Sequence, residues 1–107
     1  MVTFEQFKAL DIRIAKIVKV EDHPNADRLY VVTVEAGDKN TKQVVAGIKQ
    51  YYDKKDLLNK NIVLLSDLEP AVIRGIRSEG MLLAAKDENG LSVLVPEKDI
   101  KIGSGVS

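Results

Sequence analysis

The chain has 107 residues, no cysteine, one histidine and 16 basic residues balanced by 16 acidic ones, so its formal net charge is zero. The lack of cysteine excludes disulfides, thiol catalysis and thiolate metal sites, and the neutral charge argues against a generally basic nucleic-acid binder. The length predicts one domain over residues 1–107. No apolar run approaches the ~20 residues of a membrane helix, so we expect no membrane partner and a cytoplasmic location.

A short helix is predicted over residues 3–9. Thr3 is a suitable cap, with Gln6 three residues further on as the second member of a capping box. Phe4, Phe7 and Leu10 share one face of this helix. We expect the two phenylalanines to anchor it.

The first strand is predicted over residues 11–20. The side chains expected to alternate into the core are Ile12, Ile14, Val18 and Val20. In that register Lys16 falls on the apolar face, which predicts a bulge or bend near Ala15.

A turn-rich loop is predicted over 23–27, followed by strands over 29–35 and 43–48 that are joined by a turn at 37–40. Helical turns over 51–58, capped by Asp53, lead to a strand over 62–65. A polar loop then extends to residue 80 and is followed by strands over 81–85 and 91–95 around a turn at 87–90. The order predicts an all-β fold: a five-stranded Greek-key OB-fold barrel with a short helix between strands 3 and 4, an N-terminal helical turn and extra C-terminal strands. An SH3-like barrel and a split sheet are the alternatives that the pattern leaves open.

The polar loop before residue 81 is the most informative segment. Arg74 and Arg77 are three residues apart beside Gly75, and this spacing suits phosphate binding or stacking on a base. Ser78 offers a hydroxyl to a phosphate or a 2′-hydroxyl, and Met81 offers a soft apolar surface to a base. Core filling is the alternative for Met81. Together the residues favour a nucleic-acid contact.

Asn25 and Arg28 lie where the first two strands join, a place that borders the binding face of an OB barrel. The amide of Asn25 suits a base edge, and the equally good alternative is a turn residue that bonds its own backbone. Arg13 and Lys16 are candidates for the same face. A solvated, charged strand face is the simpler interpretation of that pair.

No catalytic residue, metal site or cofactor is predicted. His23 is the only histidine and is interpreted as a loop residue made rigid by Pro24, and Ser78 has no histidine partner for nucleophilic catalysis. With no tryptophan, three tyrosines and two phenylalanines, the chain lacks the stacking platforms of single-strand binders. We therefore expect recognition of folded RNA by shape and a few exposed bases.

Four motifs occur in order at family-like spacing: residues 11–17 (DIRIAKI), 23–29 (HPNADRL), 44–48 (VVAGI) and 73–85 (IRGIRSEGMLLAA). With them the chain resembles the tRNA-binding OB-fold domain family, most closely the C-terminal tRNA-binding and dimerisation domain of methionyl-tRNA synthetase. The resemblance implies a non-catalytic module whose partners are tRNA, a second copy of itself and the catalytic part of the synthetase, in the same or a separate chain. A free-standing structure-specific tRNA-binding protein and a dimerisation or chaperone-like module with a degenerate groove are the alternatives.

The resemblance also assigns residues. The tRNA groove is expected to include Asn25, Arg28, Arg74, Ser78 and Met81, flanked by Arg13 and Lys16, while residues 91–102 and the N-terminal helix are expected at the dimer interface. Residues 66–71 (SDLEPA) stand where the family usually has Ala-Asn-Leu-Lys-Pro-Arg, a change that removes two positive charges and adds two negative ones. We therefore expect modest tRNA affinity from one domain and a gain in effective concentration from pairing.

Overall fold

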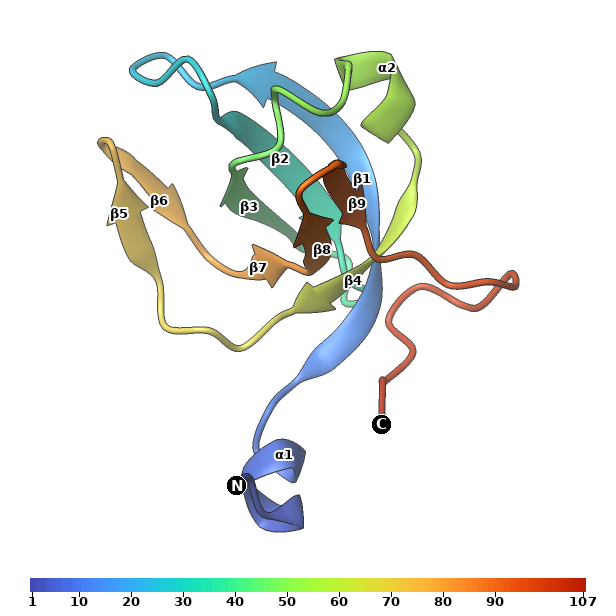
Figure 1. The fold of residues 1–107 in the computed structure, drawn as a ribbon. Coiled ribbons are helices and arrows are strands. Elements are labelled where there is room, and N and C mark those ends of the chain that lie inside the picture. The colour runs from blue at the N-terminus through green and yellow to red at the C-terminus, as the bar shows by residue number, and fades with distance from the viewer.

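The computed structural model describes all 107 residues, and strands dominate it (Figure 1). Its elements are α1 (Phe4–Lys8), β1 (Ile12–Asp22), β2 (Tyr30–Glu35), β3 (Thr41–Ala46), α2 (Lys54–Leu57), β4 (Asn61–Leu65), β5 (Ala71–Ile73), β6 (Ile76–Ser78), β7 (Met81–Leu82), β8 (Ala84–Asp87) and β9 (Gly90–Val93). Five strands form one antiparallel sheet in the order β3-β2-β1-β4-β7, and β5–β6 and β8–β9 are separate hairpins. Neither helix has the length and apolar character needed to cross a membrane.

The sheet curls into a nearly closed barrel because the segment between β6 and β7 returns to the free edge of β3. The backbone N–H of Glu79 donates to the carbonyl oxygen of Gln43 at 2.8 Å, and the N–H of Val45 donates to Ser78 Oγ at 3.0 Å. A Cβ atom on Gly80 would lie 2.9 Å from the carbonyl oxygen of Leu65, so this closing segment needs a residue without a side chain. The predicted OB-type barrel, with α2 between β3 and β4, is confirmed.

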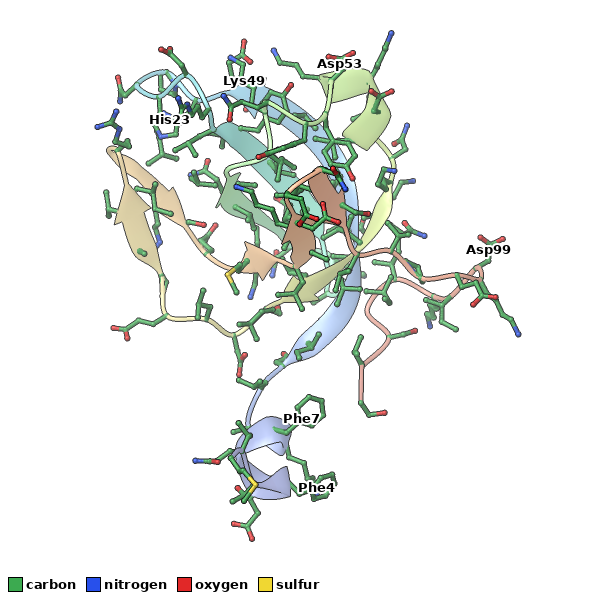
Figure 2. All side chains as sticks on the ribbon, in the orientation of Figure 1. Phe4, Phe7, His23, Lys49, Asp53 and Asp99 are labelled. Carbon is green, nitrogen blue, oxygen red and sulfur yellow. The ribbon has the colours of Figure 1, made fainter.

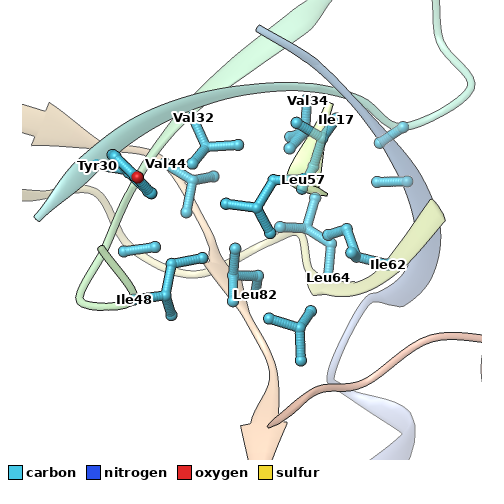
Figure 3. Close-up of a cluster of buried hydrophobic side chains, with 14 residues drawn as sticks. Ile17, Tyr30, Val32, Val34, Val44, Ile48, Leu57, Ile62, Leu64 and Leu82 are labelled. Carbon is cyan, nitrogen blue, oxygen red and sulfur yellow. The ribbon is translucent and has the colours of Figure 1, made fainter. Parts of the chain in front are cut away.

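A cluster of 14 buried apolar residues fills the barrel (Figure 3). β2 contributes every second residue, Tyr30, Val32 and Val34, as the two-residue period of a strand requires. Leu57 from α2 is fully buried in the same cluster. The short helix therefore contributes a side chain to the core, although the side chain of Asp53 makes no capping hydrogen bond.

The predicted register of β1 is wrong up to Val18, whereas Val20 packs against the core cluster as predicted. Ala15 and Ile17 belong to the core cluster, whereas Ile14 lies outside it and Val18 is exposed. A bulge is present, but it lies between Ile17 and Lys19 and not at Ala15. The strand pairs with β4 through its first half and with β2 through its second half, and the bulge falls early in the second half.

Ile14 is buried because the C-terminal segment covers the outside of β1. The N–H of Ile14 donates to the carbonyl oxygen of Ser104 at 2.9 Å, and the N–H of Val106 donates to that of Ile12 at 2.8 Å. The segment passes so close to the β2–β3 turn that a Cβ on Gly37 would lie 2.7 Å from Gly103 Cα. A distant part of the chain therefore covers apolar side chains that local alternation assigned to the core.

The strand predicted over residues 81–85 is divided at Leu83 into β7 and β8. The N–H of Leu83 donates to the carbonyl oxygen of Val63 at 3.0 Å, and the N–H of Leu94 donates to the carbonyl oxygen of Leu83 at 2.9 Å. The hairpin turn between β8 and β9 at residues 87–90 is as predicted.

The N-terminal helix forms as predicted, with the complete capping box between Thr3 and Gln6. Figure 1 shows α1 projecting from the barrel, and none of its residues is buried. Phe4 is 72% exposed and Phe7 is only half-buried, so the expected anchoring of the helix by both phenylalanines does not occur within one chain. An apolar helix face is left without a partner.

Candidate nucleic-acid interface

The segment predicted as a polar loop is a β-hairpin. β5 and β6 pair in register, with Ile73 opposite Ile76, and Arg74 and Gly75 form the two-residue turn between them. Both turn residues have positive φ, 54° for Arg74 and 88° for Gly75, which is the requirement of a type I′ turn. The usual sequence at this turn is Asn-Gly, so the Arg-Gly pair did not indicate a hairpin.

Arg74 adopts a backbone conformation that disfavours its own side chain. A non-glycine residue in the left-handed region costs about 1–2 kcal/mol, and asparagine tolerates the region better than arginine does. Such positions occur where the surrounding structure holds them and often at functional sites. The turn therefore places an arginine where stability alone favours asparagine or glycine.

The loop that follows β1 holds this turn. The carbonyl oxygen of Ile73 lies 3.0 Å from His23 Nε2, and Asn25 Nδ2 donates to the carbonyl oxygen of Arg74 at 3.1 Å. Figure 2 shows His23 in this loop, next to the end of the β5–β6 hairpin. His23 is buried and takes part in no cluster of three or more metal-ligating side chains.

The structure brings together three of the predicted site residues. Arg28 and Arg74 line one cleft of about 330 Å³ together with Asp27, and Asn25 bonds the Arg74 backbone beside it. Both arginines are exposed, and neither takes part in any of the four ion pairs of the chain. Two free guanidinium groups at one cleft form a site suited to an anion such as phosphate.

Arg77 and Ser78 lie on opposite faces of the same hairpin, because side chains alternate along a strand. Arg77 is exposed, whereas Ser78 is 5% exposed. The Ser78 hydroxyl accepts from the N–H of Val45 and donates to the carbonyl oxygen of Gly80 at 3.1 Å. Its geometry is that of a residue that closes the barrel, with the donor already used inside the protein.

Met81 is 45% exposed at the start of β7, where it pairs with Leu65 of β4. Lys16 is half-buried in the middle of β1, in register with Glu35 and Asn61. Neither residue lines the cleft between the two arginines. They lie on the barrel strands, away from the β1–β2 loop.

Arg13 lies at the opposite end of β1 from that loop. Its guanidinium donates twice to the carboxylate of Asp11, at 2.8 and 2.6 Å, and this hydrogen bonding raises the pKa of Arg13 and lowers that of Asp11. Asp67, one of the two acidic residues in the segment that departs from the family pattern, accepts the N–H of Asp11 at 2.9 Å. Asp11, Arg13 and Asp67 thus form a hydrogen-bonded cluster at this end of the barrel, and the cluster holds the start of β1 in place.

Sequence reasoning missed Gln43 as well as the role of His23. Gln43 Nε2 donates to the carbonyl oxygen of Arg77 at 2.8 Å, and its N–H donates to Glu79 Oε1 at 2.9 Å. The amide thus connects β3 to the arginine-bearing hairpin. No local pattern indicates this contact, because the partners are more than 30 positions apart.

Residues 12–105 match the family model described as "Putative tRNA binding domain", and the chain therefore belongs to this family of tRNA-binding domains. The family indicated by the four motifs is confirmed. Methionine–tRNA ligase of Thermococcus onnurineus is 52% identical over 105 residues, which cover 98% of this chain and 14% of the relative. The chain spans a similarly small part of the other curated relatives that it matches.

Two solved structures have the same fold over the whole chain. The CsaA chaperone from Picrophilus torridus superposes with a TM-score of 0.91 at 29% identity and is itself covered completely. A MetRS-related protein from Pyrococcus horikoshii also gives 0.91, over 98% of its length, at 21% identity, and this likeness concerns the fold alone.

Proposed function

We propose that the chain is the non-catalytic tRNA-binding and homodimerisation domain of a cytoplasmic methionyl-tRNA synthetase, and that it raises the affinity of the enzyme for tRNA. The observation that carries the proposal is the cleft with two unpaired arginines, Arg28 and Arg74. The relatives named methionine–tRNA ligase support the assignment to that enzyme.

In this proposal Arg28 and Arg74 bind phosphate groups of the tRNA backbone, and Arg77 binds a further one from the outer face of the hairpin. Asn25 offers its Oδ1 to a sugar hydroxyl or a base amine, because its Nδ2 is used by the Arg74 carbonyl. Met81 packs its exposed thioether on a sugar or base. Lys16 and Arg13 lie on β1 away from the cleft and are not part of the proposed contact, and Ser78 holds the hairpin to β3.

Few phosphates are bound, in keeping with a net charge of zero. Each neutralised phosphate changes log K by about −0.7 to −0.9 per unit of log salt concentration. Three arginines therefore give a total slope of about −2 to −3. In this proposal the chain binds tRNA with modest affinity and adds that affinity to a larger enzyme.

Dimerisation is proposed through α1 and the C-terminal segment. α1 has five residues and buries none, although isolated helices of this length are unstable in water. Phe4 on the helix, Leu10 just after it, and Val95 and Ile100 in the C-terminal segment are all at least 47% exposed. Their burial against a second copy stabilises both segments, provided that the interface reaches about 1,000 Å².

The test is the binding of a methionine tRNA transcript over a range of salt concentrations, followed by fluorescence anisotropy. Arg28→Ala is expected to weaken binding and to reduce the salt slope by about 1. Lys55→Ala is the matched control, because this exposed lysine on α2 forms no ion pair and loses the same charge. An equal loss of tRNA affinity in Arg28→Ala and Lys55→Ala would contradict the proposal, and so would the absence of tRNA binding by the wild-type chain at low salt.

A chaperone-like function is the second candidate, because the CsaA chaperone from Picrophilus torridus has the same fold over the full chain at 29% identity. Suppression of the aggregation of an unfolded client protein, together with no tRNA binding, favours this candidate. A free-standing tRNA-binding protein is distinguished from a synthetase domain by whether synthetase motifs occur in the same polypeptide.

A further inference from the structure

Two consecutive carbonyl groups of the β5–β6 turn, those of Ile73 and Arg74, are held by two side chains from one short loop, His23 and Asn25. The same loop carries Arg28, the other arginine of the cleft. We propose that His23 is a positioning residue for tRNA binding: together with Asn25 it holds the strained Arg74 turn at a set distance from Arg28. The inference rests on the proposed function and adds to it a residue that does not touch RNA.

The hydrogen bonds of His23 define its tautomer. The N–H of Asn25 donates to His23 Nδ1 at 3.0 Å, so Nδ1 must be the unprotonated nitrogen. Nε2 then carries the hydrogen and donates to the carbonyl oxygen of Ile73. The neutral ring therefore accepts from its own loop and donates to the hairpin, and both of its nitrogens are used.

The position of His23 is itself secured. Its side chain is 5% exposed, and its backbone N–H donates to the carbonyl oxygen of Leu29 at 3.1 Å, which closes the loop around the ring. Arg74 is not held by burial in this way, because it lies at an exposed hairpin tip with its backbone in the left-handed region. The loop thus supplies the hydrogen bonds that hold a conformation which the turn sequence disfavours.

The first measurement is tRNA binding by His23→Leu and by His23→Gln, which restores a side-chain N–H donor for Ile73. We expect His23→Leu to weaken binding about three- to tenfold, because the turn loses one of its two side-chain bonds, and His23→Gln to recover part of the loss. In an Arg74→Asn background, His23→Leu is expected to change log Kd by less than about half of the change that it causes in the wild-type protein. A full additive effect, or unchanged binding by His23→Leu, would overturn the proposal.

The second measurement requires no RNA, so the positioning role can fail separately from the proposed function. The ¹⁵N heteronuclear NOE and the φ-dependent coupling of Arg74 and Gly75 are recorded by NMR in wild type and in both variants. Increased motion of the tip in His23→Leu supports the proposal even if the wild type binds no tRNA. An unchanged, rigid tip contradicts it. Should His23→Leu fail to fold, Asn25→Ala removes the other side-chain bond of the turn and takes its place in the NMR measurement, with the same outcomes.

Discussion

Asn25 donates a hydrogen bond from Nδ2 to the carbonyl oxygen of Arg74 at 3.1 Å, although the two residues are 49 positions apart in the chain. The bond joins the loop after β1 to the tip of the β5–β6 hairpin. Because Arg74 has a φ of 54°, the loop stabilises a backbone conformation that an arginine rarely adopts. Two segments that are separate in the sequence thereby form one surface, which is the proposed binding site.

Replacing Arg74 by asparagine separates the stability of this turn from its binding function. Asn-Gly is the preferred type I′ pair, so Arg74→Asn is expected to leave the free energy of unfolding unchanged or to raise it by up to ~1 kcal/mol. tRNA affinity is expected to fall on the order of fivefold, because a charge-assisted phosphate contact is lost. Urea unfolding and anisotropy measure the two effects. Wild-type affinity in this variant would remove Arg74 from the interface.

Ser78 is predicted to act in the barrel and not on the RNA. In Ser78→Ala the N–H of Val45 loses the acceptor that the buried Ser78 hydroxyl supplies, and we expect the free energy of unfolding to fall by about 1–3 kcal/mol. Ser92→Ala is the control, since that serine is exposed and its hydroxyl contact is long, at 3.5 Å. A Ser78→Ala protein of unchanged stability that no longer binds tRNA would show instead that the hydroxyl contacts RNA.

The C-terminal segment is predicted to depend on the contact between Gly37 and Gly103. Gly37→Ala introduces a Cβ 2.7 Å from Gly103 Cα at a residue with a φ of 93°, and we expect a loss of more than about 1 kcal/mol of stability. Limited proteolysis is expected to remove the C-terminal residues sooner. Gly105→Ala is the matched control, because a Cβ there meets no atom within 4 Å. Equal melting temperatures for the two variants would contradict the prediction.

The Asp11–Arg13 pair predicts a pH dependence of stability. The hydrogen bond from Arg13 lowers the folded-state pKa of Asp11 below the ordinary value of 3.8. The pair therefore stabilises the fold above that value, and this contribution is lost as the pH falls through the folded-state pKa. Asp11→Asn is expected to lower stability near neutral pH by less than ~1 kcal/mol, since the carboxylate is 37% exposed, and to flatten the acid limb of the stability curve.

Thermal unfolding from neutral pH to pH ~3 measures this dependence. Glu88→Gln, in the exposed turn between β8 and β9, removes a carboxylate that forms no ion pair and serves as the control. An acid limb of the same steepness in Asp11→Asn and in wild type would show that the pair does not contribute.

The apolar face of α1 predicts the oligomeric state. Sedimentation of the wild-type chain at micromolar concentration is expected to give a dimer. Phe4→Asp is expected to give a folded monomer, because it places a charge on a face that the barrel leaves uncovered. Glu5→Lys changes the charge on the same helix outside that face and is expected to remain dimeric. A wild-type monomer would remove the dimerisation proposal and leave the tRNA cleft untouched.

Local sequence patterns were sufficient for the order of the main barrel strands and for the fold class. The capping box of Thr3, the alternation in residues 29–35 and the turn at 87–90 depend on near neighbours, and each forms as predicted. The register of the first half of β1 was wrong because the C-terminal segment covers Ile14, a contact that no local alternation contains. The β5–β6 hairpin was missed because its turn carries arginine where a type I′ turn prefers asparagine.

The sequence alone determined the family, the barrel and the identity of the cationic side chains, because hydrophobic period, turn residues and linked motifs are local properties. Only the tertiary structure decided which of those side chains share a cleft. It placed Arg28 beside Arg74, left Arg13 in an ion pair at the far end of β1, and turned the hydroxyl of Ser78 into the barrel. The physical reason is that hydrogen bonds between distant segments, such as those from His23 and Asn25 to the hairpin tip, set the spacing of the groups that face a ligand.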